Sequence, residues 1–109
     1  MNSTLKNQIK KSLVLALLDF KDEKECLEFL EDFLTENELE TLSKRLAVAY
    51  WLSKSRNYKN IQENLKVSSA TVAEISSMSQ KKGFKNAIKK IEADEWADKW
   101  TKKIKKIIN

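Results

Sequence analysis

The near absence of helix-breaking residues limits, more than any other feature, the folds open to this chain. Its 109 residues include no Pro and one Gly, Gly83. Because these two residue types punctuate turns and interrupt helices, a chain that lacks them favours long helices over many short strands. Apolar residues recur at three- and four-residue steps along most of the sequence, which is the period of amphipathic helices. We therefore predict an all-α fold, in one domain covering residues 1–109.

Six helical segments follow from this periodicity. They are expected at about Thr4 to Phe20, Asp22 to Phe33, Thr35 to Lys54, Tyr58 to Leu65, Ser69 to Ser79 and Phe84 to Ile107. The third segment opens with a capping box, in which Thr35 accepts from the backbone N–H of Glu38 and the Glu38 carboxylate reaches back. Asn57 and Ser68 are the predicted N-caps of the next two helices. Residues 80–83 are predicted to form a break before the last helix.

The charge of the chain is uneven along its length. Residues 1–34 carry five Lys against seven Asp or Glu, residues 35–83 carry eight basic against five acidic residues, and residues 84–109 carry eight against four. A basic rear half favours contact with a polyanion such as nucleic acid. An ordinary solvated Lys/Glu surface is the alternative interpretation of the charge taken alone.

The stretch Tyr58 to Ile75 has the hydrophobic spacing of a helix-turn-helix. The apolar residues that would hold its two helices together are Ile61, Leu65, Val67, Val72 and Ile75, with Val67 buried at the turn. Two short helices that merely fill a bundle would show the same hydrophobic pattern. The string Val-Ser-x-Ala-Thr-Val at residues 67–72 and the surrounding Lys residues favour the helix-turn-helix, at about residues 58–79.

The start of the second of these helices is the predicted DNA-reading surface. A capped helix N-terminus offers free N–H groups to a phosphate oxygen, and the leading end of a recognition helix lies in the major groove. Small side chains permit close approach, Ser hydroxyls donate and accept hydrogen bonds, and Ala can contact a thymine methyl. The predicted base-facing residues are Ser69, Ala70, Thr71 and Ala73. The predicted phosphate contacts are Lys59, Lys66, Ser68, Lys81 and Lys82, with Lys54 and Arg56 also close to the motif.

About half of the chain carries a set of short motifs that, taken together, indicate a known protein family. They are Phe33-Leu34-Thr35, Glu38-Leu39, Leu42, Arg45-Leu46 and Val48-Ala49, followed by Tyr58, Ile61, Leu65 and residues 67–72. In this combination the chain resembles the Trp repressor family and is most similar to its YerC/YecD-like branch. The resemblance implies a six-helix Trp-repressor-like fold with a central helix-turn-helix, in an intertwined homodimer. Two-fold symmetry would place two recognition helices about 34–36 Å apart over a near-palindromic DNA site.

The resemblance also divides the chain by role. Residues 1–34 would form dimerising helices, residues 35–83 the DNA-reading region, and residues 84–109 a C-terminal amphipathic helix. That last helix has Phe84, Ile88, Ile91, Trp96, Trp100, Ile104 and Ile107 on one broad face. The predicted function is a sequence-specific transcriptional regulator, a repressor, that binds double-stranded DNA as a homodimer. The alternative is a helical protein-interaction adaptor that keeps the fold without DNA binding.

Two positions depart from the pattern of the family. The Trp repressor proper holds tryptophan between an arginine of the third helix and one of the recognition helix, and here these positions are Arg45 and Glu74. Because a carboxylate would repel the ligand's carboxylate and cannot stack as a guanidinium does, tryptophan is not predicted as corepressor. Thr35 and Arg45 stay a possible effector pocket, or serve in a cap and in a salt bridge with Glu38 or Glu74. Lys66 occupies a turn position where Gly is usual, which predicts a turn of different shape.

Catalytic, metal and membrane roles have no support in the sequence. The chain contains no His, no Gly-rich phosphate loop and no paired cysteine motif, so we predict no enzyme activity, catalytic residue, cofactor or metal site. Its one cysteine, Cys26, excludes an intrachain disulfide and is consistent with a cytoplasmic location. The apolar run from Leu13 to Leu18 is far shorter than the ~20 residues that span a bilayer, so no membrane partner is predicted.

Overall fold

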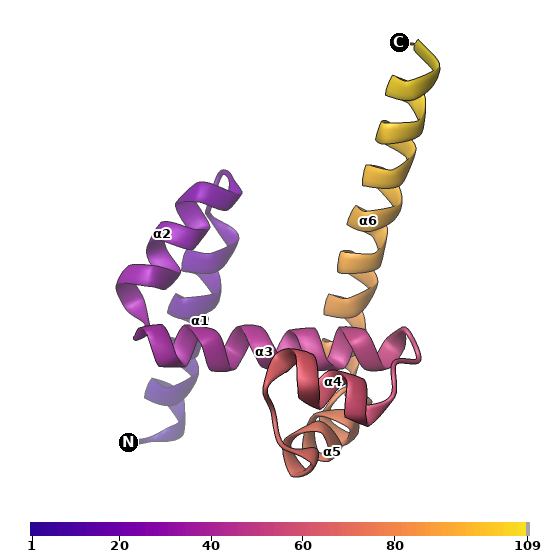
Figure 1. Ribbon diagram of the computed structural model, residues 1–109. Coiled ribbons are helices and arrows are strands. Elements are labelled where there is room, and N and C mark those ends of the chain that lie inside the picture. Colours follow the sequence, from indigo (N-terminus) through magenta and orange to yellow (C-terminus); the bar gives the residue numbers. More distant parts are fainter. Residues whose placement is uncertain (109) are drawn as a thin grey trace. The chain divides into compact units, whose positions relative to one another are not determined.

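The computed structural model describes the backbone of residues 1–108 and the side chains of residues 1–96, Lys102 and Lys106. This part of the chain contains six helices and no strands, which confirms the predicted all-α class. Figure 1 shows them in chain order: α1 (Ser3–Leu18), α2 (Glu23–Phe33), α3 (Glu36–Ser53), α4 (Tyr58–Leu65), α5 (Ser69–Met78) and α6 (Lys82–Ile108). None of these helices combines the length and the apolar character that crossing a bilayer requires. The chain forms two compact units, Met1–Thr41 and Leu42–Asn109.

Side-chain caps determine where the helices start, because the first N–H groups of a helix have no backbone acceptor. The predicted capping box is present. The Glu38 N–H donates to Thr35 Oγ1 at 3.1 Å, and the Thr35 N–H donates to Glu38 Oε1 at 2.9 Å. Asn57 Oδ1 accepts from the Asn60 N–H at 2.8 Å. These contacts confirm the predicted starts of α3 and α4.

The first unit has little buried surface of its own. Neither α1 nor α2 contains a buried residue. Three aromatic rings make its main apolar contacts: the centroids of Phe20 and Phe29 are 5.3 Å apart, and Phe29 stacks on Phe33 at 4.9 Å. Several large apolar side chains of α1 stay exposed, and Leu18 has 76% of its surface in solvent. The unit therefore presents apolar surface that its own two helices do not cover.

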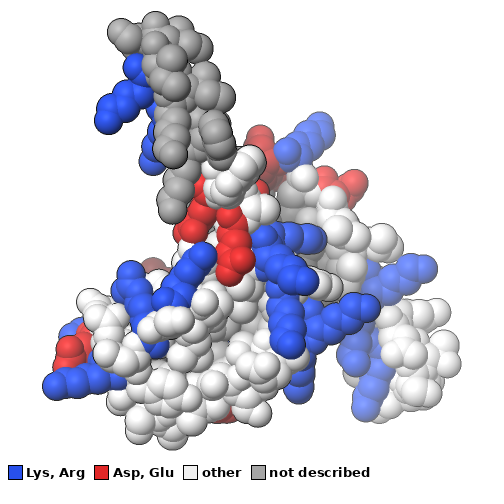
Figure 2. All heavy atoms as spheres, turned by 90° about the vertical axis from the view of Figure 1, so that its right-hand side faces the viewer, with Lys and Arg blue, Asp and Glu red and all other residues white. Residues whose placement is uncertain are grey.

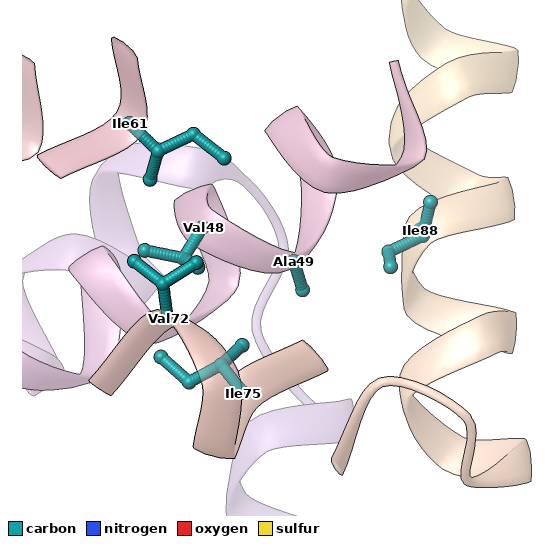
Figure 3. Packing of buried hydrophobic residues seen from close by; sticks show 6 residues of the cluster. All are labelled: Val48, Ala49, Ile61, Val72, Ile75 and Ile88. Carbon is teal, nitrogen blue, oxygen red and sulfur yellow. The ribbon is translucent and has the colours of Figure 1, made fainter. Parts of the chain in front are cut away.

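The core of the second unit joins α6 to α4, α5 and the end of α3. Figure 3 shows its six buried residues: Val48 and Ala49 of α3, Ile61 of α4, Val72 and Ile75 of α5, and Ile88 of α6. Val48, Ile61 and Val72 are fully buried. Each such side chain contributes about 1.5–3 kcal/mol through the removal of apolar surface from water. This cluster fixes α4 and α5 against the end of α3.

Leu65 and Val67 were expected inside the core, but both are only half-buried at its edge. The reason is local, because both flank the turn after α4, where the backbone comes to the surface. Val48, which is not among the apolar residues predicted to hold the helix-turn-helix together, is the most buried residue of α3. The predicted apolar face of the last helix also includes Trp100, Ile104 and Ile107, which lie outside the residues whose side chains are described.

Two predicted helix boundaries are corrected. The first helix ends at Leu18, two residues before the predicted end. The predicted break at residues 80–83 is wrong at its end, because α6 begins at Lys82 and includes Gly83. The Lys81 N–H donates to the Met78 carbonyl at 3.0 Å, and the Lys85 N–H already makes a helical bond to the Lys81 carbonyl at 3.1 Å. Gly83 has no positive φ, so it acts as a helical residue and not as a turn residue.

Candidate nucleic-acid interface

α4 and α5 form a pair of short helices that pack against each other in the second unit. Ile61 of α4 and Val72 of α5 are both fully buried in the same cluster, as Figure 3 shows. Residues 66–68 alone separate the two helices. Two packed helices joined by a turn of three or four residues form a helix-turn-helix.

The turn between the two helices is built around Lys66. This residue has φ 55° and ψ 52°, in the left-handed region, and its N–H donates to the Gln62 carbonyl. The Val67 N–H donates to the same carbonyl at 3.4 Å. The prediction of a differently shaped turn is therefore wrong: the chain keeps the conformation for which Gly is usual and places Lys in it. The steric cost of a side chain there is about 1–2 kcal/mol.

Ser68 caps the start of α5, as predicted. Its hydroxyl oxygen accepts from the Thr71 N–H at 3.1 Å, and its O–H donates to Thr71 Oγ1 at 2.9 Å. The Ser68 carbonyl accepts the first helical bond, from the Val72 N–H at 3.1 Å. Because the hydroxyl of Ser68 is turned toward Thr71, the groups left for an anion at this end are the backbone N–H groups of the first turn.

The leading end of α5 faces solvent in this chain. Ser69, Ala70 and Ala73 are exposed, whereas Val72 and Ile75 on the opposite face are buried. The fourth predicted base-facing residue, Thr71, is half-buried, and its hydroxyl takes part in the cap. The structure therefore brings three of the four predicted base-facing residues together on one accessible helix end.

The predicted phosphate contacts are also accessible: Lys59, Lys66, Ser68, Lys81 and Lys82 are all exposed. Lys59 lies in the first turn of α4, and Lys81 and Lys82 lie where the chain enters α6. Figure 2 shows Lys and Arg side chains on the face that holds the turn between α3 and α4, where Asp and Glu side chains also lie. The exposed lysines near the helix-turn-helix suit a polyanionic partner.

The sequence of the chain is similar to the sequences of one known protein family. The family model described as Trp repressor protein matches residues 8–92. The chain belongs to the Trp repressor family. It is also 35% identical over 60 residues to the uncharacterized protein YerC of Bacillus subtilis strain 168, a match that covers 55% of this chain and 58% of that relative. The chain thus matches little more than half of that relative's length.

The helix-turn-helix lies within the part of the chain that matches the Trp repressor family. The matched residues 8–92 include both helices of this motif, α4 and α5. Among the residues that the structure describes, no three His, Cys, Asp or Glu side chains gather into a group able to hold a metal ion.

The predicted effector residues of this family member occupy different settings. Thr35 belongs to the first unit, and its hydroxyl is taken up by the capping box. Arg45 belongs to the second unit and is half-buried. The proposed salt bridge of Arg45 with Glu74 is not formed in the described part of the chain, and the Glu38 carboxylate serves the Thr35 N–H. Glu74 itself is exposed on α5.

One contact next to the helix-turn-helix was not predicted. The guanidinium carbon of Arg56 lies 4.0 Å from the ring centroid of Trp51. The sequence gives no clear signal for it, because the left-handed residue that brings Arg56 to Trp51 is Ser55 and not the glycine that usually marks such a helix end. Arg56 was expected near DNA from its charge alone, and its fixed position became visible only in three dimensions.

Proposed function

We propose that this member of the Trp repressor family is a sequence-specific transcriptional repressor that reads the major groove of a near-palindromic DNA site as an intertwined homodimer. The observation that carries this proposal is the exposed, capped leading end of α5, with Ser69, Ala70 and Ala73 on its surface. Small side chains at that end let the backbone approach base edges closely, and the backbone N–H groups can contact a phosphate.

The homodimer is supported by the apolar surface of the first unit. The 16-residue helix α1 has no buried residue in the single chain, although most helices depend on the burial of an apolar face. Its exposed apolar residues include Leu5, Ile9, Leu13, Val14, Leu15, Leu17 and Leu18. Contiguous apolar surface of this kind marks an interaction site, and we propose a second copy of the chain as the partner.

Tryptophan is not the proposed corepressor. The position on α5 that would complete a tryptophan site carries Glu74, whose negative charge opposes a ligand carboxylate. The protein is therefore proposed to bind its site without tryptophan. Isothermal titration with tryptophan should give no heat of binding, and affinity for the operator should be the same with and without it.

DNA binding is tested in two steps. A preferred site is first selected from a pool of random duplexes by binding to the protein. The protein is then titrated into the selected duplex and into a random-sequence duplex at two salt concentrations. We expect binding whose log K falls linearly with log salt, and a tighter complex with the selected site. Ala73→Glu should abolish that preference, whereas Ser77→Glu adds the same charge about 6 Å farther along α5 and should cost less. Lys59→Ala should weaken binding to every sequence equally. Transcription in vitro from a promoter with the selected site should fall as protein is added.

The outcome that favours the alternative is clear. If the wild-type protein binds no duplex even at low salt, the repressor proposal is wrong and the protein is a helical adaptor.

The dimer is tested separately by sedimentation of the double variant Ile9→Lys/Leu13→Lys, which should be monomeric or unfolded. Lys10→Gln on the same helix should leave the dimer intact. A wild-type protein that sediments as a monomer would rule out the intertwined assembly.

A further inference from the structure

The chain between α3 and α4 closes the end of α3 with a specific backbone motif. The Arg56 N–H donates to the Trp51 carbonyl at 3.2 Å, and the Ser55 N–H donates to the Leu52 carbonyl at 3.0 Å. Ser55 has φ 62°, in the left-handed region. These two crossed hydrogen bonds around one left-handed residue form a Schellman motif, which places residue 56 against residue 51.

In this motif the contact between the two residues is usually apolar. Here a guanidinium replaces the apolar side chain, and it lies 4.0 Å from the centroid of the Trp51 ring. One nitrogen of the same group, Nη1, donates to Asn60 Oδ1 at 3.4 Å. A guanidinium held over an aromatic ring by a cation–π contact keeps N–H donors available for hydrogen bonds to other groups. The contact with the Trp51 ring and the hydrogen bond to Asn60 together restrict the orientation of the guanidinium.

Arg56 lies next to the start of a helix. It directly precedes Asn57, the N-cap of α4, so the guanidinium lies beside a helix end that itself carries partial positive charge. The neighbouring cation, Lys54, has a carboxylate partner, because its Nζ lies 3.8 Å from Glu92 Oε1. Among the residues with described side chains, Arg56 has no carboxylate at ion-pair distance. Two positive features therefore meet at one exposed position that an anion can fill.

We propose that Arg56, held by Trp51, is a preorganised binding residue for a phosphate of the DNA backbone, located outside the helix-turn-helix. This inference rests on the proposed DNA-binding function. In helix-turn-helix proteins the first helix of the motif crosses the DNA backbone, and here that helix is α4, whose start adjoins Arg56. A bidentate guanidinium–phosphate pair would fix the register of the protein on the duplex without reading a base.

The test compares Arg56→Met with the wild-type protein on a random-sequence duplex. Met keeps an apolar contact with Trp51 and removes the charge, so circular dichroism melting should be nearly unchanged. We expect the slope of log K against log salt to become shallower by about 0.9, the value for one phosphate contact. Lys24→Gln, which removes one charge on α2, is the control and should leave the slope unchanged. Arg56→Lys should restore the slope but not the full affinity.

The role of Trp51 is tested by a double-variant cycle. Trp51→Leu should weaken DNA binding several-fold in the wild-type background and have no effect when Arg56→Met is already present. If the two losses add independently, Trp51 does not act through Arg56 and the preorganised pair is wrong. Both single variants melt cooperatively if the Schellman motif is intact, which separates loss of binding from loss of fold.

The source of the phosphate is decided by the remaining arms. Inorganic phosphate at the ionic strength of the chloride buffer should not quench the tryptophan fluorescence of the wild-type protein. Quenching that Arg56→Met removes, with an unchanged salt slope on DNA, would assign the site to a free phosphate and overturn the proposal. If the wild-type protein binds DNA and the slope of log K against log salt is the same for Arg56→Met, then Arg56 only stabilises the end of α3 and does not contact a phosphate. If the wild-type protein binds no DNA, both this inference and the proposed function are wrong.

Discussion

Ser68 and Thr71 are joined by two hydrogen bonds at the start of α5, one through the backbone N–H of Thr71 at 3.1 Å and one through its hydroxyl at 2.9 Å. Both bonds depend on a single oxygen, Ser68 Oγ. The cap therefore controls the stability of α5 and also the position of the N–H groups that would meet DNA. The stability of α5 and its proposed contact with DNA both depend on Ser68 Oγ. A substitution that separates the two effects must therefore keep an oxygen acceptor at residue 68.

Ser68→Ala should lower the free energy of unfolding by about 0.5–2 kcal/mol, because the Thr71 N–H loses its acceptor. Ser68→Asp should retain most of the stability, since Asp is an equally good N-cap, but it should weaken DNA binding by adding negative charge at the phosphate-binding end. Urea unfolding and DNA titration of the two variants measure both effects. Equal DNA affinity for Ser68→Asp and the wild-type protein would contradict the placement of phosphate at this helix end.

The capping box of α3 predicts a dependence of stability on acid pH. The N–H and the hydroxyl of Thr35 hold the pKa of Glu38 below its ordinary value of 4.5. A lowered pKa means that the carboxylate contributes its full stability above about pH 4.5 and loses it as the pH falls through the lower folded-state value.

Glu38→Gln should therefore differ most from the wild-type protein near neutral pH, and the difference between their urea midpoints should shrink as the solution is acidified. Glu36→Gln, in the same helical turn, is the control and should show a weaker dependence on pH. A constant difference between Glu38→Gln and the wild-type protein over the acid range would show that the carboxylate charge plays no part in the cap.

Local sequence signals predicted much of this fold. The capping box at Thr35, the N-caps Asn57 and Ser68, and the bounds of α4 all follow from side chains that act within four residues of themselves. The buried residues Ile61, Val72 and Ile75 followed from helical periodicity. The resemblance to the Trp repressor family likewise depended on these same short-range motifs, which is why the family was accessible from the sequence.

Long-range and backbone features were not accessible in the same way. The left-handed conformation of Lys66 has no side-chain signal, because the residue type argues for another conformation. The burial of Val48 depends on α4 and α5 packing against α3, which the periodicity of a single helix does not specify. The Arg56–Trp51 stack needs the Schellman motif, whose left-handed residue is a serine and not the usual glycine.

Tyr50 and Glu95 predict a change at alkaline pH. The Tyr50 hydroxyl donates to Glu95 Oε2, and this bond, with the nearby negative charge, raises the pKa of Tyr50 to about 12. A raised pKa means that this bond stabilises the fold fully below about pH 10 and is lost as the pH rises through 12.

The measurement is the tyrosinate absorbance of Tyr58→Phe, a variant in which Tyr50 is the remaining tyrosine. Its titration should be centred near pH 12, and adding Glu95→Gln should move the midpoint down toward 10. If Glu95→Gln leaves the midpoint of the titration unchanged, the Tyr50 hydroxyl is not hydrogen-bonded to the Glu95 carboxylate in solution.

Lys66 and Gly83 occupy positions that would each suit the other's residue type. Lys66 is left-handed, where a side chain costs about 1–2 kcal/mol, and Gly83 is helical, where a methyl group costs nothing and meets no atom within 4 Å. Lys66→Gly should raise the free energy of unfolding by up to about 1 kcal/mol, because relief of that strain exceeds the ~0.4–1 kcal/mol gain in entropy of the unfolded chain. Gly83→Ala should raise it by about 0.4–1 kcal/mol, because alanine lowers the conformational entropy of the unfolded chain.

The two substitutions lie at separate sites, so their effects on the urea midpoint should add. They differ in DNA binding. Lys66→Gly removes one predicted phosphate contact and should make the slope of log K against log salt shallower by about 0.9, whereas Gly83→Ala should leave the slope unchanged. If Lys66→Gly raises the free energy of unfolding and weakens binding to every duplex, the lysine is explained by its contact with DNA. Backbone strain is retained at positions where the strained residue serves the function. If Lys66→Gly gains stability and binds DNA with the wild-type slope, the strain at this turn serves no contact with phosphate.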